Sequence, residues 1–186
     1  MIGYAFCGSF CTLSRALLGM ERLVAAGEEV LPILSDAVMH TDTRFWQAAA
    51  FCRRVEEVAG RPPVTTVAAA EPLGPKMPLE ALVIAPLTGN TLAKLANGVT
   101  DTAVTMAAKA HLRQDRPLLL ALASNDALAT GLGNLAKFTV RRGVFFVPMS
   151  QDDPVGKPHS LVAEMERIPE CLAALRGGRQ MLPLFT

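Results

Sequence analysis

The sequence predicts a single α/β domain with a doubly wound parallel sheet, and three observations carry this prediction. Short unbroken apolar runs, such as 81–85 and 117–122, are typical of strands that helices cover on both faces. Amphipathic helical patterns alternate with these runs, and short connections with right-handed crossovers join such elements into one sheet. The chain of 186 residues suits one large core, and we find no repeat or domain boundary within 1–186.

The elements before residue 68 follow from apolar spacing and turn residues. Strands are expected over 2–7, 29–34 and 64–67, and helices over 13–27 and from Asp42–Thr43 to Gly60. Pro32 places the second strand near a sheet edge or a bulge, because proline cannot donate to a central ladder. Phe45 is expected on the apolar face of the second helix.

The C-terminal elements continue the alternation of strands and helices. Helices are expected over 102–111 and 128–138, strands over 117–122 and 144–147, and loops over 68–78 and 149–160. The strand over 144–147 is expected to be the last one. A final helix begins at Ser160 or at Pro169 and ends at Gly177. The apolar tail over 177–186 is expected to contact a neighbouring subunit, since solvent exposure there would be unfavourable.

The composition narrows the class of protein. With 51% hydrophobic and 19% charged residues, it favours a buried sheet, extensive subunit contacts, or both. The net charge of +1 gives no basic surface for nucleic acid or an anionic membrane. No apolar run reaches the roughly 18–20 residues of a membrane span, and the apolar N-terminus lacks a positively charged leader. We therefore expect a cytoplasmic protein that binds neither nucleic acid nor membrane.

Neither the cysteines nor the histidines show the spacing of a metal site. The four cysteines are widely scattered without a Cys-x-x-Cys pair, so we expect free thiols, no disulfide framework and no metal. His40, His111 and His159 form no ligand pair either. His111 ends an expected helix, which favours a capping or surface role.

The stretch 79–101 holds the most informative pattern of the chain. An apolar strand over 81–85 is expected to end at Pro86, and a polar turn leads directly into a helix that closes at Asn97–Gly98. Such a turn lies at the carboxyl end of a strand, where open α/β sheets bind ligands. Free backbone N–H groups and the helix dipole would attract an anion there. An ordinary turn with Asn90 or Thr91 as N-cap explains the spacing equally well.

Hydroxyl-rich turns follow three other expected strands. Gly8–Ser9 follows the first strand, Ser35 the second, and Ser124–Asn125 the strand over 117–122. Each turn alone is explained by helix capping, but together they indicate a polar ligand edge. In the loop over 149–160, Lys157 and His159 are weak candidates for substrate binding, although a solvated loop explains both.

Three motifs resemble the flavoprotein family, which includes phosphopantothenoylcysteine decarboxylase, peptide-cysteine decarboxylases and the flavin prenyltransferases. The motifs read IGYAFCGSF, LTGNTLAKLANGVTDTAVTMAAKA and ALASNDALATGLGNL, and the likeness runs through nearly the whole chain. The resemblance implies a Rossmann-like sheet that binds FMN in a groove. It also implies a homo-oligomer, a trimer or a multiple of trimers, in which a neighbouring subunit completes that groove.

The resemblance implies specific cofactor-binding residues. Matched position by position, they are Gly8, Ser9, Ser35, Thr88, Asn90 and Thr91, the last three in the turn that holds the flavin phosphate. The decarboxylases carry a Pro-Ala-Met-Asn turn, of which only Asn125 survives here. Their catalytic histidine lies after the second strand, where His40 is the sole candidate. Asn125 and His40 are therefore weak catalytic candidates.

Within the family, the likeness is greatest to one component of a two-component synthase of spore-forming bacteria. It implies that the chain acts with a separate component that binds NADP, and that the pair forms a small dicarboxylate in the mother cell. The alternatives are an FMN-dependent decarboxylase of a cysteine-containing substrate and a non-catalytic subunit that stabilises its partner.

Overall fold

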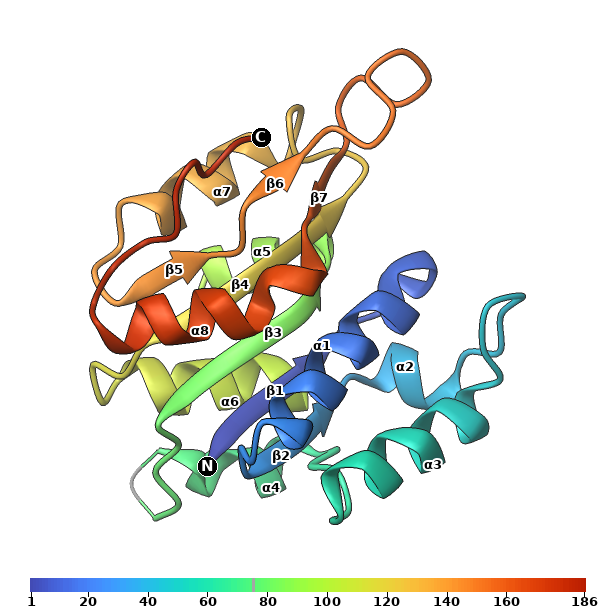
Figure 1. The fold of residues 1–186 in the computed structure, drawn as a ribbon, viewed down its shortest axis with the longest axis vertical. Helices are drawn as coiled ribbons and strands as arrows, with labels where there is room; N and C mark the ends of the chain where they lie inside the picture. Colours follow the sequence, from blue (N-terminus) through green and yellow to red (C-terminus); the bar gives the residue numbers. More distant parts are fainter. Residues whose placement is uncertain (75) are drawn as a thin grey trace.

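A computed structural model describes residues 1–74 and 76–186, and its centre is a mixed sheet (Figure 1). The strand order is β2-β1-β3-β4-β7-β6, and β5 also pairs with β4. Five strands are parallel: β1 (Ile2–Phe6), β2 (Val30–Leu34), β3 (Ala81–Leu87), β4 (Leu118–Ser124) and β5 (Val144–Phe146). The expectation of a doubly wound parallel sheet is thus confirmed for the body of the sheet.

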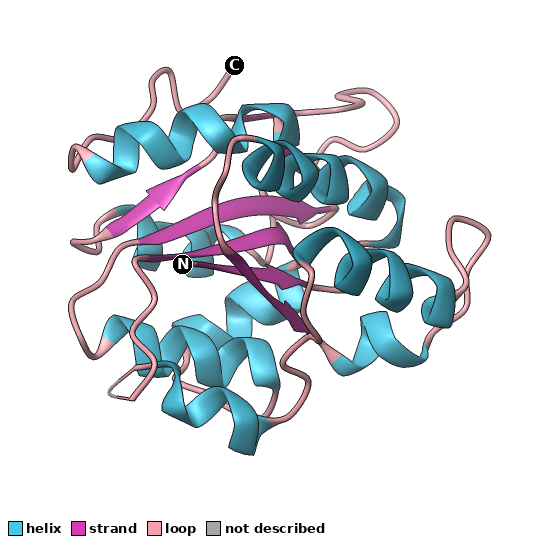
Figure 2. Cartoon of the chain, turned by 60° about the horizontal axis from the view of Figure 1, so that its bottom comes forward, coloured by secondary structure: helices cyan, strands magenta, loops and turns pink. Residues whose placement is uncertain are grey.

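Helices cover both faces of the sheet (Figure 2). On one face lie α1 (Leu13–Ala25), α3 (Ala48–Ala59) and α8 (Ile168–Arg176), and on the other lie α5 (Gly89–Ala96), α6 (Ala103–Leu112) and α7 (Leu132–Thr139). Short helices complete the chain: α2 (Asp36–His40), α4 (Val67–Ala70), and the 3-10 turns η1 (Phe10–Thr12), η2 (Glu71–Leu73) and η3 (Met165–Arg167). None of the helices in the described residues is long and apolar enough to cross a bilayer.

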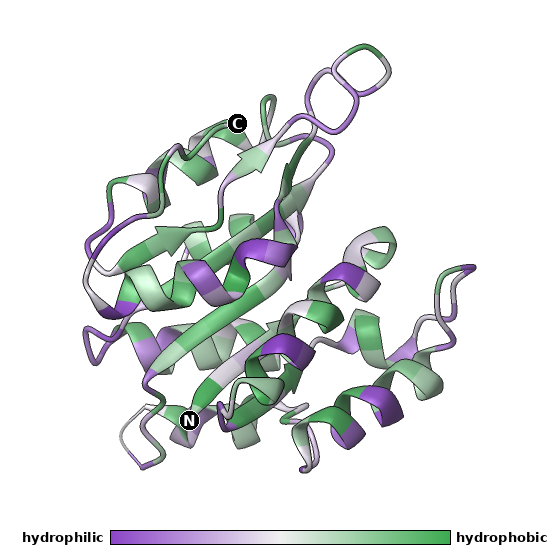
Figure 3. Ribbon diagram, viewed as in Figure 1, coloured by the Kyte–Doolittle hydropathy of each residue, from purple (hydrophilic) through white to green (hydrophobic). Residues whose placement is uncertain are grey.

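The strands form the apolar centre of the molecule (Figure 3), and one buried hydrogen bond ties α1 to them. Every residue of β1 and β3 is buried. The Tyr4 hydroxyl on β1 donates to the Ala16 carbonyl oxygen on α1 at 2.7 Å. A Cβ on Gly19 would lie 3.0 Å from that hydroxyl, so the glycine permits the close approach. The helix that follows the first polar turn therefore has a fixed position on the sheet.

The expected helix at Asp42–Thr43 begins later than its sequence pattern indicates. Helix α3 starts at Ala48, whose backbone N–H donates to Asp42 Oδ1 at 2.9 Å. The carboxylate thus satisfies the first turn of the helix from a preceding loop, which connects α2 to α3. Phe45 consequently lies outside the helix and is 45% exposed, so its expected place on an apolar helical face is wrong.

Two further expectations in the first half of the chain need correction. Pro86 does not end its strand, since β3 continues to Leu87 with an irregular register between Ile84 and Leu87. Residues 64–67 form only an isolated bridge from Val64 to Ile33, and Thr66 then caps α4. The expected loop over 68–78 contains the end of α4 and η2, and its residue 75 lies outside the described residues.

The sheet ends in an antiparallel hairpin that the sequence pattern does not predict. Strands β6 (Met149–Ser150) and β7 (Leu161–Ala163) pair with each other, and β7 pairs with the end of β4. The strand over 144–147 is therefore not the last one. The final helix begins at Ile168 with Pro169 in its first turn, not at Ser160. The expected helix over 128–138 starts only at Leu132, after a series of turns.

The C-terminal tail pairs with its own sheet. Met149 N–H donates to the Leu184 carbonyl oxygen at 2.9 Å, and Thr186 N–H donates to the Met149 carbonyl oxygen at 3.1 Å. Leu182 and Phe185 remain 70% and 56% exposed. One side of the tail is thus held by β6, and its outer side presents apolar surface.

His111 is buried, which corrects the expectation of a capping or surface role. Its ring is fully inaccessible, and Nε2 lies 2.8 Å from the Pro117 carbonyl oxygen. A carbonyl only accepts, so Nε2 carries the proton, while Nδ1 has no partner among the described residues. Burial lowers the pKa of His111, and Arg116 adds to this effect against the hydrogen bond to Pro117. The imidazole is therefore neutral in the folded protein.

This buried imidazole predicts a loss of stability in mild acid. The unfolded chain takes up a proton near the ordinary histidine pKa of about 6.5, whereas folded His111 resists it. The free energy of unfolding should therefore fall between about pH 7 and pH 5, and His111→Gln, which keeps a donor but cannot be protonated, should reduce that slope. Urea unfolding at several pH values in this range measures the free energy of unfolding and its slope with pH. An equal slope in His111→Gln and wild type would contradict the prediction.

Candidate functional site

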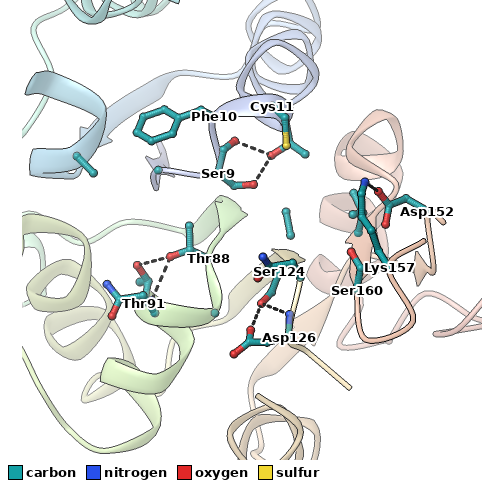
Figure 4. Close-up of a pocket in the computed structure, with 18 of the residues that line it drawn as sticks. Ser9, Phe10, Cys11, Thr88, Thr91, Ser124, Asp126, Asp152, Lys157 and Ser160 are labelled. Atoms are coloured by element: carbon teal, nitrogen blue, oxygen red, sulfur yellow. Dashed lines mark hydrogen bonds and ion pairs between the residues drawn. The ribbon is translucent and has the colours of Figure 1, made fainter. Parts of the chain in front are cut away.

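The carboxyl ends of four parallel strands open into one large cleft (Figure 4). Its volume is about 1300 Å³, above the roughly 300–1,000 Å³ of typical small-molecule sites. The strand order reverses between β1 and β3, which is the switch point where open α/β sheets bind ligands. Nine residues singled out from the sequence line this cleft: Gly8, Ser9, Ser35, Thr88, Asn90, Thr91, Asn125, Lys157 and His159.

His40 lies outside the lining of the cleft. It is the last residue of α2 and is exposed. The helix that carries it starts at the cleft with Asp36, and its following turn leads His40 away from the lining residues. The structure therefore gives no support to a catalytic role for His40.

The turn at the start of α5 combines helix capping with free backbone donors. Thr88, not Asn90 or Thr91, is the N-cap, and its Oγ1 accepts from Thr91 N–H at 3.1 Å. The Thr88 hydroxyl also donates to Thr91 Oγ1 at 3.0 Å, so its proton is engaged within the turn. The backbone N–H groups of Gly89 and Asn90 make no hydrogen bond within the described residues and border the cleft. Helix capping thus occurs here through Thr88, and the N–H groups of Gly89 and Asn90 remain as donors that an anion in the cleft could meet.

The first two polar turns differ in how their hydroxyls are used. Thr12 Oγ1 lies 2.9 Å from the Ser9 carbonyl oxygen and 3.0 Å from Ser9 Oγ, which closes the turn before α1 (Figure 4). Ser35 Oγ, after β2, is buried and has no hydrogen-bond partner among the described residues. A buried hydroxyl without a partner costs roughly 1–3 kcal/mol. Its place in the cleft indicates a group that a ligand would satisfy.

The turn after β4 carries the Asp126 carboxylate, which accepts hydrogen bonds from two neighbouring hydroxyl groups. Ser124 Oγ donates to Asp126 Oδ1 at 2.5 Å, and Thr130 Oγ1 donates to Oδ2 at 2.7 Å. These two hydrogen bonds lower the pKa of Asp126, so it is ionised at neutral pH. A Cβ on Gly89 would lie 2.5 Å from Ser124 Oγ, so only glycine fits between α5 and this turn. Asn125 is exposed beside them on the cleft.

The loop between β6 and β7 forms another rim of the cleft and carries the ion pair of Asp152 and Lys157. Lys157 Nζ lies 2.7 Å from Asp152 Oδ2, which lowers the pKa of Asp152 and raises that of Lys157 (Figure 4). Both side chains reach solvent, so their attraction contributes little to stability. His159 borders the same rim, and the buried Ser160 begins the return into β7.

Arg44 and Phe45 are cleft residues that the sequence pattern did not reveal. They lie in the loop between α2 and α3, and the Arg44 guanidinium stacks 4.8 Å from the centre of the Phe45 ring. Arg44 forms no ion pair among the described residues, whereas the other cleft cations, Lys94 and Lys157, pair with Asp101 and Asp152. The misplaced start of α3 concealed this position, because a helical pattern assigned Phe45 to the core.

Cys7 is a buried thiol beneath the cleft. Burial raises its pKa to about 11, against hydrogen bonds from the Thr91 side chain and the Thr88 backbone that lower it. The thiol is therefore neutral and serves packing. Among the described residues, no cluster of three His, Cys, Asp or Glu side chains is arranged to hold a metal ion. The cleft thus offers neutral hydroxyl and N–H donors in its floor and charges on its rims.

Comparison with known proteins identifies the protein family to which this fold and cleft belong. The chain belongs to the family described as Flavoprotein, whose model matches residues 2–174. It is 42% identical to the B subunit of dipicolinate synthase from Bacillus subtilis (strain 168) over 184 residues, which is 99% of this chain and 92% of that protein.

Solved structures support the same relationship. The crystal structure of the dipicolinate synthase B subunit from Bacillus halodurans C matches with a TM-score of 0.91 and 39% identity, covering 100% of this chain and 95% of that chain. A dodecameric FMN-dependent UbiX-like decarboxylase from Escherichia coli O157:H7 has a TM-score of 0.61 and 23% identity, covering 79% of each chain. At that identity the second likeness concerns the fold alone.

Proposed function

We propose that this chain acts as the flavoprotein component of a dipicolinate synthase. The observation that carries the proposal is the match to the B subunit of that enzyme over nearly the whole of both chains, in sequence and in structure. The reaction forms pyridine-2,6-dicarboxylate from a dihydro precursor, which loses two electrons and two protons. The separate A subunit of the synthase, which binds NADP, acts with it during sporulation in the mother cell.

The cleft residues fit FMN. Ser35 Oγ and the N–H groups of Gly89 and Asn90, which have no hydrogen-bond partner within residues 1–74 and 76–186, can donate to a phosphate or to ring carbonyls. Gly8 and Ser9 approach from the first turn, and Thr91 shapes the helix start through its bond to Thr88. When bound, FMN would supply two-electron oxidation chemistry. The cleft volume leaves room for a small second molecule beside a cofactor.

The rim charges suit a dicarboxylate substrate. Arg44 on one rim lacks a carboxylate partner among the described residues, and a guanidinium binds carboxylates in a two-pronged geometry. Lys157, with His159 beside it, lies on the loop between β6 and β7, and a substrate carboxylate would share its ammonium with Asp152. Asn125 is an uncharged donor on the same cleft. A cysteine decarboxylase is less well supported, because His40 does not reach the cleft.

The role of Ser35 predicts a separation of stability from cofactor affinity. Ser35→Ala removes a hydroxyl that has no partner in the described part of the protein, so the Tm of the protein without FMN should stay equal or rise. The Kd for FMN should rise about tenfold or more, since a hydrogen bond to a charged group contributes roughly 1.5–3 kcal/mol. Flavin fluorescence titration and thermal unfolding measure the two effects. Thr139→Ala, which removes a hydroxyl on α7, is the control, and an unchanged Kd in Ser35→Ala would exclude Ser35 from the site.

Activity should require both components of the synthase. We expect dipicolinate, followed by its absorbance, at the full rate only when this protein is mixed with its NADP-binding partner, and little from either one alone. A full rate from the NADP-binding partner alone would contradict the proposed function. A rate that is unaffected by removing flavin from the mixture would instead identify a non-catalytic stabilising subunit.

The same assay tests the substrate-binding rim. Arg44→Ala should raise the KM for the dihydro precursor several-fold, because it removes the cleft cation that has no partner among the described residues. Arg53→Ala is the matched control, since Arg53 is exposed on α3 outside the cleft lining. Equal KM values for the two variants would exclude Arg44 from substrate binding.

We also propose that the chain forms a homo-oligomer, a trimer or a multiple of trimers, through its C-terminal tail. Leu182 and Phe185 present apolar surface beside β6. Light scattering should report a particle of at least three 19.8 kDa chains, and Leu182→Asp should dissociate it. Val155→Asp, at a 95% exposed loop position, should leave the particle intact. A wild-type particle of 19.8 kDa would contradict the proposal.

A further inference from the structure

A second cavity, of about 240 Å³, lies at the other end of α5 from the cleft. Its walls come from the turn after α5, one side of α6 and the C-terminal part of α7. Helix α5 packs against both α6 and α7, so the cavity lies between three elements of one face of the sheet. None of its lining residues lines the cleft or takes part in the proposed function.

Three cations surround this cavity, and in the part of the chain that the structure describes no carboxylate pairs with them. Lys109, Arg113 and Arg141 line it, and within the described part of the chain none of them forms an ion pair. The lining contains no aspartate or glutamate among the residues that the structure describes. Lys109, Arg113 and Arg141 carry like charges on one cavity, and like charges that share a partly enclosed site repel one another. An anion placed among them would relieve that repulsion.

The inner walls of the cavity are apolar. Leu95 and Leu112 contribute aliphatic surface, and the Phe138 ring, 2% exposed, forms part of its wall. The Arg141 guanidinium lies 5.9 Å from the centre of that ring, which aligns a cation with an aromatic surface. Val99 is 41% exposed at the same place. Such a wall would favour a ligand with an apolar body over inorganic phosphate.

From this arrangement we infer a second binding site that takes a small carboxylate with an apolar, aromatic-sized body. The carboxylate would be held by Arg113 and Arg141, whose guanidinium groups bind it in pairs of hydrogen bonds, with Lys109 as a third positive charge. The body would pack on the Phe138 ring and the two leucines. The volume is below that of drug-sized sites, which limits the ligand to about the size of a benzoate.

The site is separate from the cleft although they share one wall. Lys94 lines the cleft and the next residue, Leu95, lines the second cavity. Likewise, Thr102 lines the cleft and Thr100 lines the second cavity. Helix α5, about 12 Å long, thus carries one site at its N-terminus and the other at its C-terminus.

Isothermal titration of the assembled protein with benzoate tests the inference. We expect saturable binding of benzoate, and binding of benzyl alcohol or inorganic phosphate at least tenfold weaker, since each lacks one of the two features recognised. The double variant Arg113→Gln/Arg141→Gln should weaken benzoate binding tenfold or more. Arg142→Gln is the matched control, because Arg142 is exposed next to Arg141 but does not line the cavity.

Three outcomes would overturn the inference. These are absence of saturable benzoate binding, equal affinity in the double variant and wild type, and loss of binding in the cleft variant Ser35→Ala. The last would place benzoate in the cleft and not in the second cavity. Because benzoate binding is read without substrate or the NADP-binding partner, failure here is distinguishable from failure of the proposed function.

Discussion

The covering of the parallel sheet on both faces is the constraint on which the rest of the structure depends. With β1 and β3 wholly buried, backbone groups of the sheet reach solvent only where strands end. Parallel strands end together at one edge, so the turns after β1, β2, β3 and β4 form a single cleft. The hydroxyl residues in these turns lie far apart in the sequence, from Ser9 to Ser124, yet they face one cavity. The Tyr4–Ala16 hydrogen bond fixes the position of α1, the helix that follows the first of these turns, on the sheet.

Sequence signals that act within a few residues predicted the elements of the fold whose stability depends on neighbouring residues. The strand, turn and helix over 79–101 were recognised because an apolar run, a hydroxyl turn and Asn97–Gly98 each act within a few residues. The N-cap was assigned to the wrong residue, since Thr88, Asn90 and Thr91 can all cap and only the backbone geometry selects Thr88. The choice matters chemically, because the proton of the capping hydroxyl is donated to Thr91 and is no longer available to a ligand.

Contacts across loops and between strands determined what the sequence pattern missed. Strands β6 and β7 are only two and three residues long, and they exist because they pair with each other and with β4. The start of α3 depends on a bond from Ala48 to Asp42 across a loop. That loop brings Arg44 to the cleft, a placement no periodic pattern could report. His111 is buried by the strand that begins at Leu118, through contact with Pro117.

The close approach of Gly89 to Ser124 has an evolutionary consequence. A methyl group at position 89 would overlap the Ser124 hydroxyl and lie 2.8 Å from Asp126 Oδ1. A larger side chain at 89 therefore requires a smaller one at 124, and the carboxylate at 126 would then lose its hydrogen bond from Ser124. A lineage in which position 89 acquires a side chain should therefore also change position 124. The residues at 89, 124 and 126 together then record whether the edge between β3 and β4 kept the same geometry.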